Sequence, residues 1–398
     1  MKKVPNLRFK EFSGEWEQTT LGKVTNGFEY GMNAAATEFD GENKYIRITD
    51  IDEITNKYLD NDVVSPSGIL EDKYLVNDND ILFARTGAST GKTYLYNKED
   101  GRLYFAGFLI RSNVNSLNNS KFIFLQTQNQ EYKKWVKVTS MRSGQPGINS
   151  QEYASYSFYS PKLGEQEKIA AFFSLIDKKI ALQTEKVEEL KNYKKGLMQK
   201  IFSQELRFKD ENGNEYPEWE EKTLGYFLSE SKIKGDTGDR AKKLTVKLWA
   251  KGIVEKRDDI QGSAETQYYI RKAGQLMYGK LDFLNCAFGI VPKELDGFQS
   301  TLDAPAFDVR NANSIFLLNR IIQKDFYKKN GDIADGSRKA KRIHVDTFLN
   351  MKLFMPTLEE QNKIASFFSL IDKKLELEME KLEQLQEYKK GLLQQMFI

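Results

Sequence analysis

The chain contains the same long segment twice. Residues 161–203 read PKLGEQEKIAAFFSLIDKKIALQTEKVEELKNYKKGLMQKIFS, and residues 356–398 read PTLEEQNKIASFFSLIDKKLELEMEKLEQLQEYKKGLLQQMFI. Aligned without gaps at an offset of 195 residues, 27 of the 43 positions are identical. A shorter repeat precedes each half, because residues 7–22 match residues 206–225 through LRFK, EWE and TLG. A period this long indicates a duplicated pair of domains and not a solenoid of short repeats.

Both long repeats carry the apolar pattern of a helix. Steps of alternately four and three residues from Ile169 meet eight apolar side chains among ten, and steps from Ile364 do the same, with the polar interruptions at matching places. A seam sustained over more than four heptads is typical of a coiled coil. Glu165 and Glu360 stand in the first turns, where a carboxylate suits the helix dipole. We expect the helices to pair as a rod of roughly 55 Å; the alternative is that each packs only on its own domain.

Further apolar residues lie beside the seam near the start of each helix. They are Phe172 and Leu175 in the first copy and Phe367 and Leu370 in the second. Such a surplus belongs either to a domain core or to a patch that binds a partner protein. In the second case the chain offers two equivalent docking surfaces.

Two variable segments, roughly residues 17–160 and 220–355, read as mixed α/β. The β-rich runs lie at residues 45–51, 80–84, 268–279 and 313–318, and the helical stretches at residues 121–137 and 319–330. Because the helical stretches occupy corresponding places, we interpret the segments as diverged copies of one fold.

The predicted fold class is therefore α+β, with two diverged α/β domains separated by two long antiparallel helices that form a coiled-coil spacer. The predicted boundaries are 1–160 and 204–355 for the domains, and 161–203 and 356–398 for the helices. The short repeat follows the first helix but also opens the chain. If the second helix ends beside the N-terminal segment, the arrangement closes and is pseudo-twofold symmetric.

Basic residues gather in one loop of each variable segment. Residues 140–149, SMRSGQPGIN, connect a helix to the last strand, and residues 335–345, DGSRKAKRIHV, stand at the equivalent place. The first loop offers Arg142, Ser143 and Gln145, and the second offers Arg338, Lys339, Lys341 and Arg342. Charged loop tips are usually only solvated, but two at matching places, each beside a helical Lys pair, favour contact with phosphate. Their divergence is what two readers of different DNA sequences need.

The stretch FARTGASTGKTYLY at residues 83–96 looks at first like a nucleotide-binding phosphate loop. A Walker A loop needs four residues between its glycines and a helix directly after it. Here three residues separate Gly87 from Gly91, and the following TYLYN is β-prone. At the offset of 195 residues, Arg85 falls on Lys280, where a basic residue but no phosphate loop stands. We interpret the stretch as a strand and a tight polar turn that contact DNA. The predicted contact residues are Arg85, Thr86, Ser89, Lys92 and, in the second copy, Lys280.

Composition narrows the function classes. The chain has 60 Lys and Arg against 57 Asp and Glu, and the resulting net charge of +3 is too small to prove a nucleic-acid partner. One cysteine (Cys286) and one histidine (His344) give no basis for a disulfide, a Cys/His zinc site or a catalytic dyad. We therefore predict no metal site and no catalytic residue. Because no apolar run has the length of a membrane span and the first residues lack a signal core, we expect a cytoplasmic protein.

Together these residues resemble the DNA-specificity subunit of a Type I restriction-modification system. The resemblance rests on the motif P-x-L-x-E-Q-x-K-I-A-x-F-F that opens each long helix, on YIRITDI at residues 45–51, and on DILFARTGASTGK at residues 80–92. It covers essentially the whole chain, and the helix motif, present twice at this spacing, is highly specific.

The resemblance implies a non-catalytic, DNA-binding subunit. Each variable domain would be a target recognition domain for one half of a split DNA sequence, and the paired helices would fix the spacer between the halves. Two modification subunits would dock on the helices, at the apolar residues beside the seam, and restriction subunits would join them. S-adenosylmethionine, ATP and Mg would belong to these partner subunits. The alternative is a coiled-coil scaffold for protein–protein interaction that does not read DNA.

Overall fold

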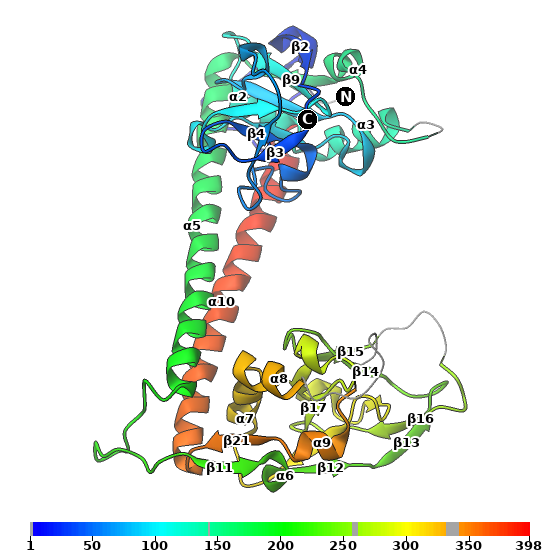
Figure 1. Ribbon diagram of the computed structural model, residues 1–398. Helices are drawn as coiled ribbons and strands as arrows, with labels where there is room; N and C mark the ends of the chain where they lie inside the picture. Colours follow the sequence, from blue (N-terminus) through cyan, green and yellow to red (C-terminus); the bar gives the residue numbers. More distant parts are fainter. Residues whose placement is uncertain (1–2, 142–143, 257–261, 332–341) are drawn as a thin grey trace. The chain divides into compact units, whose positions relative to one another are not determined.

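The computed structural model describes residues 3–141, 144–256, 262–331 and 342–398. Its elements form two compact units, Met1–Lys186 with Met379–Ile398, and Val187–Glu378 (Figure 1). Two long helices, α5 (Leu163–Phe202) and α10 (Leu358–Met396), are each divided between the units. Each unit therefore contains the start of one long helix and the end of the other, and the predicted α+β class with two long helices is confirmed.

A four-stranded antiparallel sheet is the centre of the first unit. Its strand order is β2 (Thr25–Tyr30), β9 (Leu109–Val114), β6 (Asp80–Ala84) and β7 (Thr93–Leu95). Three two-stranded sheets accompany it: β1 (Glu17–Thr20) with β10 (Ser157–Ser160), β3 (Ala36–Glu38) with β5 (Val64–Pro66), and β4 (Lys44–Ile46) with β8 (Leu103–Phe105). The short helices are α1 (Leu21–Val24), α2 (Ser120–Gln126), α3 (Gln130–Thr139) and α4 (Ser150–Ser155).

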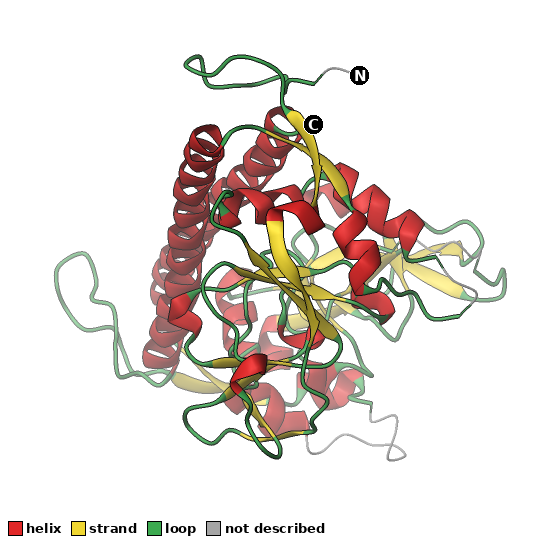
Figure 2. Ribbon diagram, turned by 90° about the horizontal axis from the view of Figure 1, so that it is seen from above, coloured by secondary structure: helices red, strands yellow, loops and turns green. Residues whose placement is uncertain are grey.

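The second unit repeats the central sheet in the same order. Its strands are β12 (Leu228–Ser231), β20 (Ala306–Val309), β17 (Leu276–Tyr278) and β18 (Phe288–Ile290). The accompanying strands are β11 (Glu220–Thr223) with β21 (Lys352–Met355), β13 (Lys234–Thr237) with β16 (Gln267–Ile270) and β19 (Gln299–Ser300), and β14 (Leu244–Val246) with β15 (Ile253–Glu255). The short helices are α6 (Leu224–Phe227), α7 (Ser314–Ile321), α8 (Lys324–Gly331) and α9 (Val345–Leu349). Figure 2 shows the helices in red, the strands in yellow and the connecting loops in green.

One predicted strand is wrong. Residues 313–318, NSIFLL, open helix α7 because the side chain of Asn313 caps it, accepting hydrogen bonds from the backbone N–H groups of Ile315 and Phe316. A short apolar run fits either a buried strand or a buried helix, and the cap decides between them here. The helix buries Phe316 and Leu317 in the core.

Other elements differ from the sequence prediction in their extent. The helix expected at residues 319–330 is the end of α7 followed by α8, and the β-rich run at residues 268–279 is divided between β16 and β17. The helix expected at residues 121–137 is two helices, because the Asn129 side chain accepts a hydrogen bond from Tyr132 N–H and begins α3 anew. The run at residues 45–51 leaves the extended conformation after Ile46 and forms a single 3-10 turn, Ile48–Asp50. Helix α4, capped by Asn149, lies between the loop at residues 140–149 and the last strand, which the prediction joined directly.

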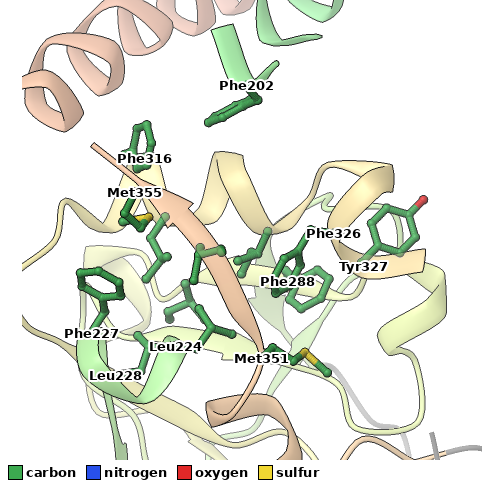
Figure 3. Close-up of a cluster of buried hydrophobic side chains, with 14 of the residues drawn as sticks. Phe202, Leu224, Phe227, Leu228, Phe288, Phe316, Phe326, Tyr327, Met351 and Met355 are labelled. Carbon is green, nitrogen blue, oxygen red and sulfur yellow. The ribbon is translucent and has the colours of Figure 1, made fainter. Parts of the chain in front are cut away.

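The ends of the long helices belong to the domain cores. In the second unit, Phe202 from the end of α5 packs against Phe316 of α7 and against Phe368 of α10. Figure 3 shows Phe202 pointing toward Phe316 and Met355 above the side chains of α6 and the sheet. In the first unit, Phe397, which follows α10, makes the corresponding contact and stacks on Phe122 of α2. The alternative that each helix packs only on its own domain is therefore wrong, because each domain core contains residues from both helices.

A buried arginine–glutamate pair attaches each short repeat to a long helix. Arg8 donates two hydrogen bonds of 2.7 Å to Glu165 at the start of α5, and Arg207 makes the corresponding pair with Glu360 of α10 at 2.9 Å. Fork-to-fork contacts of this kind are the strong form of an ion pair. The glutamates predicted to suit the helix dipole therefore have a more specific role, which is to hold the LRFK segment.

Equivalent backbone hydrogen bonds join each short repeat to the end of a long helix. In one case the two residues are close in sequence, and in the other they lie near opposite ends of the chain. Leu206 N–H donates to the carbonyl of Lys200 at 3.0 Å, just after α5 ends. Leu7 N–H donates to the carbonyl of Gln395 at 2.9 Å, near the end of α10. The end of α10 thus lies beside the N-terminal segment, as the predicted symmetry requires.

The glutamine that follows each glutamate joins the helix to its domain. Gln166 accepts a hydrogen bond from Asn119 N–H, and Gln361 accepts one from Asn313 N–H, at 2.9 and 3.0 Å. Asn119 and Asn313 are the capping residues of α2 and α7. The repeated Glu-Gln dipeptide is thus explained by two neighbouring contacts of the helix start.

The lysines that interrupt the apolar seam are paired across the helices. Lys389 of α10 forms a 2.7 Å ion pair with Asp177 of α5, and Lys194 of α5 forms the matching pair with Asp372 of α10. Asp177 has a second partner, Lys121 of α2, at 2.6 Å.

In the described part of the chain, no helix combines the length and the apolar character needed to cross a membrane.

We expect Arg8→Ala to lower the free energy of unfolding by about 3 kcal/mol, because it leaves a buried carboxylate without its partner. The Glu165 side chain is only 4% exposed and the Arg8 side chain 16%. Urea unfolding followed by tryptophan fluorescence measures the loss. The double variant Arg8→Ala/Glu165→Gln should recover part of it, and Lys3→Ala, which removes an exposed ion pair, should cost far less. A cost for Arg8→Ala no larger than that of Lys3→Ala would contradict this account.

We also expect Asp177 to make stability depend on acid. Burial raises the pKa of Asp177, but Lys121 and Lys389 outweigh burial and leave the pKa below its ordinary value. A depressed folded-state pKa stabilises the protein above the ordinary value and loses that contribution as pH falls through the folded-state pKa. Asp177→Asn should therefore lower the melting temperature at pH 7, and the difference from wild type should shrink below about pH 4. Asp372→Asn, which loses one lysine partner instead of two, is the control and should show a smaller difference; equal effects would refute the role of Lys121.

Candidate nucleic-acid interface

Arg85 directly follows Ala84, the last residue of strand β6. Arg85 N–H donates to the Phe108 carbonyl at 3.0 Å, and the Arg85 carbonyl accepts from Ile148 N–H at 2.9 Å. These two bonds fix the backbone of Arg85 on both sides.

Lys280 occupies the same place in the second unit. Its N–H donates to the Asp303 carbonyl at 2.9 Å, and its carbonyl accepts from Ile343 N–H at 3.1 Å. All three positions, 280, 303 and 343, are offset by 195 residues from Arg85 and its partners. The structure therefore places Arg85 and Lys280 on one equivalent backbone site, as the repeat alignment predicts.

The stretch at residues 83–96, which looks like a phosphate loop in the sequence, is a hairpin and not a nucleotide-binding loop. Strand β6 leads into a 3-10 turn, Gly87–Ser89, and strand β7 begins at Thr93 and pairs back on β6. A phosphate loop of the Walker type would continue as a helix at this point. The β-prone reading of TYLYN is confirmed.

The hairpin packs against the loop at residues 140–149. Thr86 forms an isolated β-bridge with Gly147, and Gly87 N–H donates to the Pro146 carbonyl at 3.0 Å. Gln145 lies exposed beside this contact, and Ser89 is half-buried in the turn. The sequence identifies both loops as basic or polar, and the structure adds that they form one surface. Arg142 and Ser143 of this loop lie outside the described residues.

The side chain of Arg85 lies over an aromatic ring. Its guanidinium is 4.9 Å from the centre of the Tyr30 ring, at the end of strand β2. Both residues line a hollow of about 630 Å³, together with the exposed Phe108. Tyr30 and Phe108 cannot be singled out from the sequence, because single aromatic residues at strand ends are indistinguishable from core residues without the fold.

Lys92 differs from Arg85 in its surroundings. Its ammonium group forms a 2.9 Å ion pair with Glu53, and its side chain is 17% exposed. A lysine held by a carboxylate has less positive charge to offer a phosphate, so its predicted DNA contact stays a prediction with a weaker basis than that of Arg85.

The corresponding site of the second unit is charged instead of aromatic. Arg342 pairs with Asp303 at 3.5 Å. Burial lowers the pKa of Lys280, against the opposing effect of Glu230 and Asp303. Neither Glu230 nor Asp303 was predicted from the sequence as a residue of this site. The remaining predicted contacts of this loop, Arg338, Lys339 and Lys341, lie outside the described residues.

The apolar residues beside the helix seam divide into two kinds. Phe172 is half-buried against Phe9, and Phe367 is half-buried against Phe208, at ring-centre distances of 5.7 and 5.4 Å. The two leucines predicted beside them, Leu175 and Leu370, are each 69% exposed. The phenylalanines therefore help to hold the LRFK segments, whereas the leucines face outward at matching positions.

Comparison with known proteins gives a family that matches the first variable domain and the helix after it. Residues 14–192 match the family model of the Type I restriction modification DNA specificity domain. This range covers the first variable domain and most of α5, and the internal duplication gives the rest of the chain the same organisation.

Similar proteins extend the match over almost the whole chain. It is 24% identical over 417 aligned residues to the Type I restriction enzyme MjaVIII specificity subunit of Methanocaldococcus jannaschii, which covers 97% of this chain and 94% of that protein. It is 23% identical to the putative type I restriction enzyme MjaX specificity subunit of the same organism, over 96% of this chain and 93% of that one.

Solved structures agree on the fold. The crystal structure of a Type I restriction-modification S subunit from M. genitalium has a TM-score of 0.58 and 16% identity, and the match covers 99% of both chains. A chain from a type I restriction-modification complex matches with a TM-score of 0.56 and 14% identity, over 95% of this chain and 96% of that one. Residues 14–192 thus match the Type I DNA specificity domain, and the chain as a whole is similar to Type I restriction enzyme specificity subunits. Because these subunits are non-catalytic, the prediction that the chain is not an enzyme agrees with the family.

Proposed function

We propose that this chain reads a bipartite DNA sequence, one half with each variable domain. The observation that carries the proposal is the equivalent backbone site at Arg85 and Lys280. The backbone hydrogen bonds there are the same in both domains, but the surrounding side chains are aromatic in one and charged in the other. A constant frame with divergent side chains suits two readers of different base sequences.

The long helices would set the spacer between the two half-sites. At ~1.5 Å per residue, the 40 residues of α5 measure about 60 Å, and the 39 residues of α10 are nearly equal to it. The paired lysines and aspartates in the seam support a fixed register between the helices, because a shift by one residue would separate both pairs. A fixed register is what a spacer of defined length needs.

Two modification subunits would dock beside the starts of the long helices, one in each half of the duplicated chain. Leu175 and Leu370 support this because each leaves most of a large apolar side chain in water at the same repeat position. Restriction subunits would join the modification subunits. S-adenosylmethionine, ATP and Mg would be bound by these partners, and the present chain would supply sequence recognition and assembly.

The competing function is a coiled-coil scaffold for protein–protein interaction, and one experiment separates the two. We expect that exchanging residues 17–160 for another recognition domain changes one half of the selected DNA sequence only. Selection from a randomised duplex DNA library, with the full chain assembled with its modification subunits, measures the preferred sequence. The second half-site and the spacer should stay unchanged because residues 220–355 and both helices are unchanged. The absence of any sequence preference in the wild-type complex would favour the scaffold, and a change in both halves would refute modular reading.

We expect Leu175→Asp and Leu370→Asp each to weaken the docking of one modification subunit. Removing a leucine from an interface and placing a charge there costs at least ~1.5–3 kcal/mol, which is about a 10- to 100-fold loss of affinity. Native mass spectrometry should then show complexes with one modification subunit, and the double variant should show none. Leu117→Asp, at another exposed leucine outside the helices, is the control and should retain two. Two bound subunits in the double variant would place the docking surface elsewhere.

A further inference from the structure

The guanidinium of Arg85 is held in place without using its hydrogen-bond donors. It lies over the Tyr30 ring at 4.9 Å, which is within the range of a cation–π contact. Among the residues that the structure describes, no carboxylate or carbonyl accepts a hydrogen bond from this guanidinium. Its planar set of N–H groups is therefore available to a ligand.

The ring beneath the guanidinium is itself fixed. The Tyr30 hydroxyl lies 3.2 Å from Ser150 Oγ and accepts a hydrogen bond from Ser150 N–H at 3.2 Å, at the start of α4. The Arg85 backbone is fixed by Phe108 and Ile148 on its two sides. An arginine with a fixed backbone and a fixed stacking partner loses little conformational freedom when it binds, which favours a directional contact.

The space in front of Arg85 is a hollow with mixed walls. Its volume is about 630 Å³, and its apolar wall includes Met32, Ala34 and Phe108, of which Phe108 is 60% exposed. The second arginine of the hollow, Arg47, is already engaged, because its guanidinium bonds Asp50 and Asp62. Arg85 is thus the arginine of this hollow whose donors remain available within the described residues.

This combination fits the edge of a guanine better than a phosphate. Guanine presents two acceptors, O6 and N7, side by side in the major groove, and the fork of an arginine matches both at once. An apolar side chain such as Phe108 can contact a neighbouring thymine methyl group, whereas a phosphate placed against the same apolar wall would lose water without compensation. The equivalent Lys280 is a point charge surrounded by Asp303 and Arg342, which does not provide this paired geometry.

We propose that Arg85, stacked on Tyr30 beside Phe108, reads one guanine in the half-site of the first domain. The inference rests on the proposed function, since it assumes that this domain reads DNA. It assigns to Arg85 a specificity-determining role in place of a general contact with the DNA backbone.

The test uses the full chain assembled with its modification subunits and a randomised duplex DNA library. Arg85→Lys keeps the positive charge but removes the fork. We expect the preference for guanine at one position of the first half-site to fall about 10-fold, with the second half-site and the salt dependence of binding unchanged. Arg102→Lys is the matched control, because Arg102 also lies over a tyrosine ring, that of Tyr104, but does not line the hollow. Thermal unfolding of both variants checks that they fold.

A second arm identifies the atom that is read. Replacing that guanine by 7-deazaguanine removes the N7 acceptor and should weaken wild-type binding about 10-fold, while the Arg85→Lys complex should show little further loss. If Arg85→Lys weakens all sequences equally and leaves every base preference intact, Arg85 contacts phosphate, and the inference fails while the proposed function stands. Loss of preference at a base pair without guanine also overturns it. A wild-type complex without any sequence preference would instead refute the proposed function.

Discussion

The buried pair between an arginine and a glutamate, made once in each unit, is the contact on which the rest of the structure depends. Arg8 and Glu165 are 157 residues apart, and Arg207 and Glu360 are 153 apart, so each pair joins the two flanks of a variable domain. Each pair fixes a short LRFK segment on the start of a long helix, and the adjacent glutamine accepts a hydrogen bond from the backbone N–H of the asparagine that caps a domain helix. One turn of each long helix thereby joins three parts of the chain. Such a turn tolerates few substitutions, which is a physical reason for its near identity in the two repeats.

The two long helices are held together by charge as well as by apolar packing. A lysine in an apolar seam costs stability unless a carboxylate meets it, and both seam lysines are met by an aspartate of the other helix. The repeats are not equivalent in this respect, because Lys121 adds a second positive charge beside Asp177, while its counterpart in α7, counted from the capping asparagines, is Ile315. The variable domains thus influence the helices that carry them.

The sequence predicts this architecture well because its strongest signals are global. An ungapped repeat and a long heptad seam leave few alternatives, so the duplicated domains and the long helices could be predicted. The prediction of single helices and strands fails where one polar side chain determines which element forms. Asn313 turns an apolar run into a helix, and Asn129 divides one predicted helix into two. The candidate site shows the same limit: Arg85 is recognisable from the repeat, but Tyr30 and Phe108 meet it only through strand pairing across 55 and 23 residues of sequence.

A fixed backbone site that accepts different side chains would, under the proposed function, let DNA specificity diverge without loss of the fold. Arg85 and Lys280 each donate and accept the same two backbone hydrogen bonds, and neither bond involves a side chain. Exchanging the side chain at such a position leaves the sheet and its core untouched, because β6 and β17 end before it. Phe108 and Asp303 accept the hydrogen bonds from Arg85 N–H and Lys280 N–H through their backbone carbonyl groups. Under the proposed function, stability would rest on the backbone of these residues and recognition on their side chains, so that each could change while the other is kept.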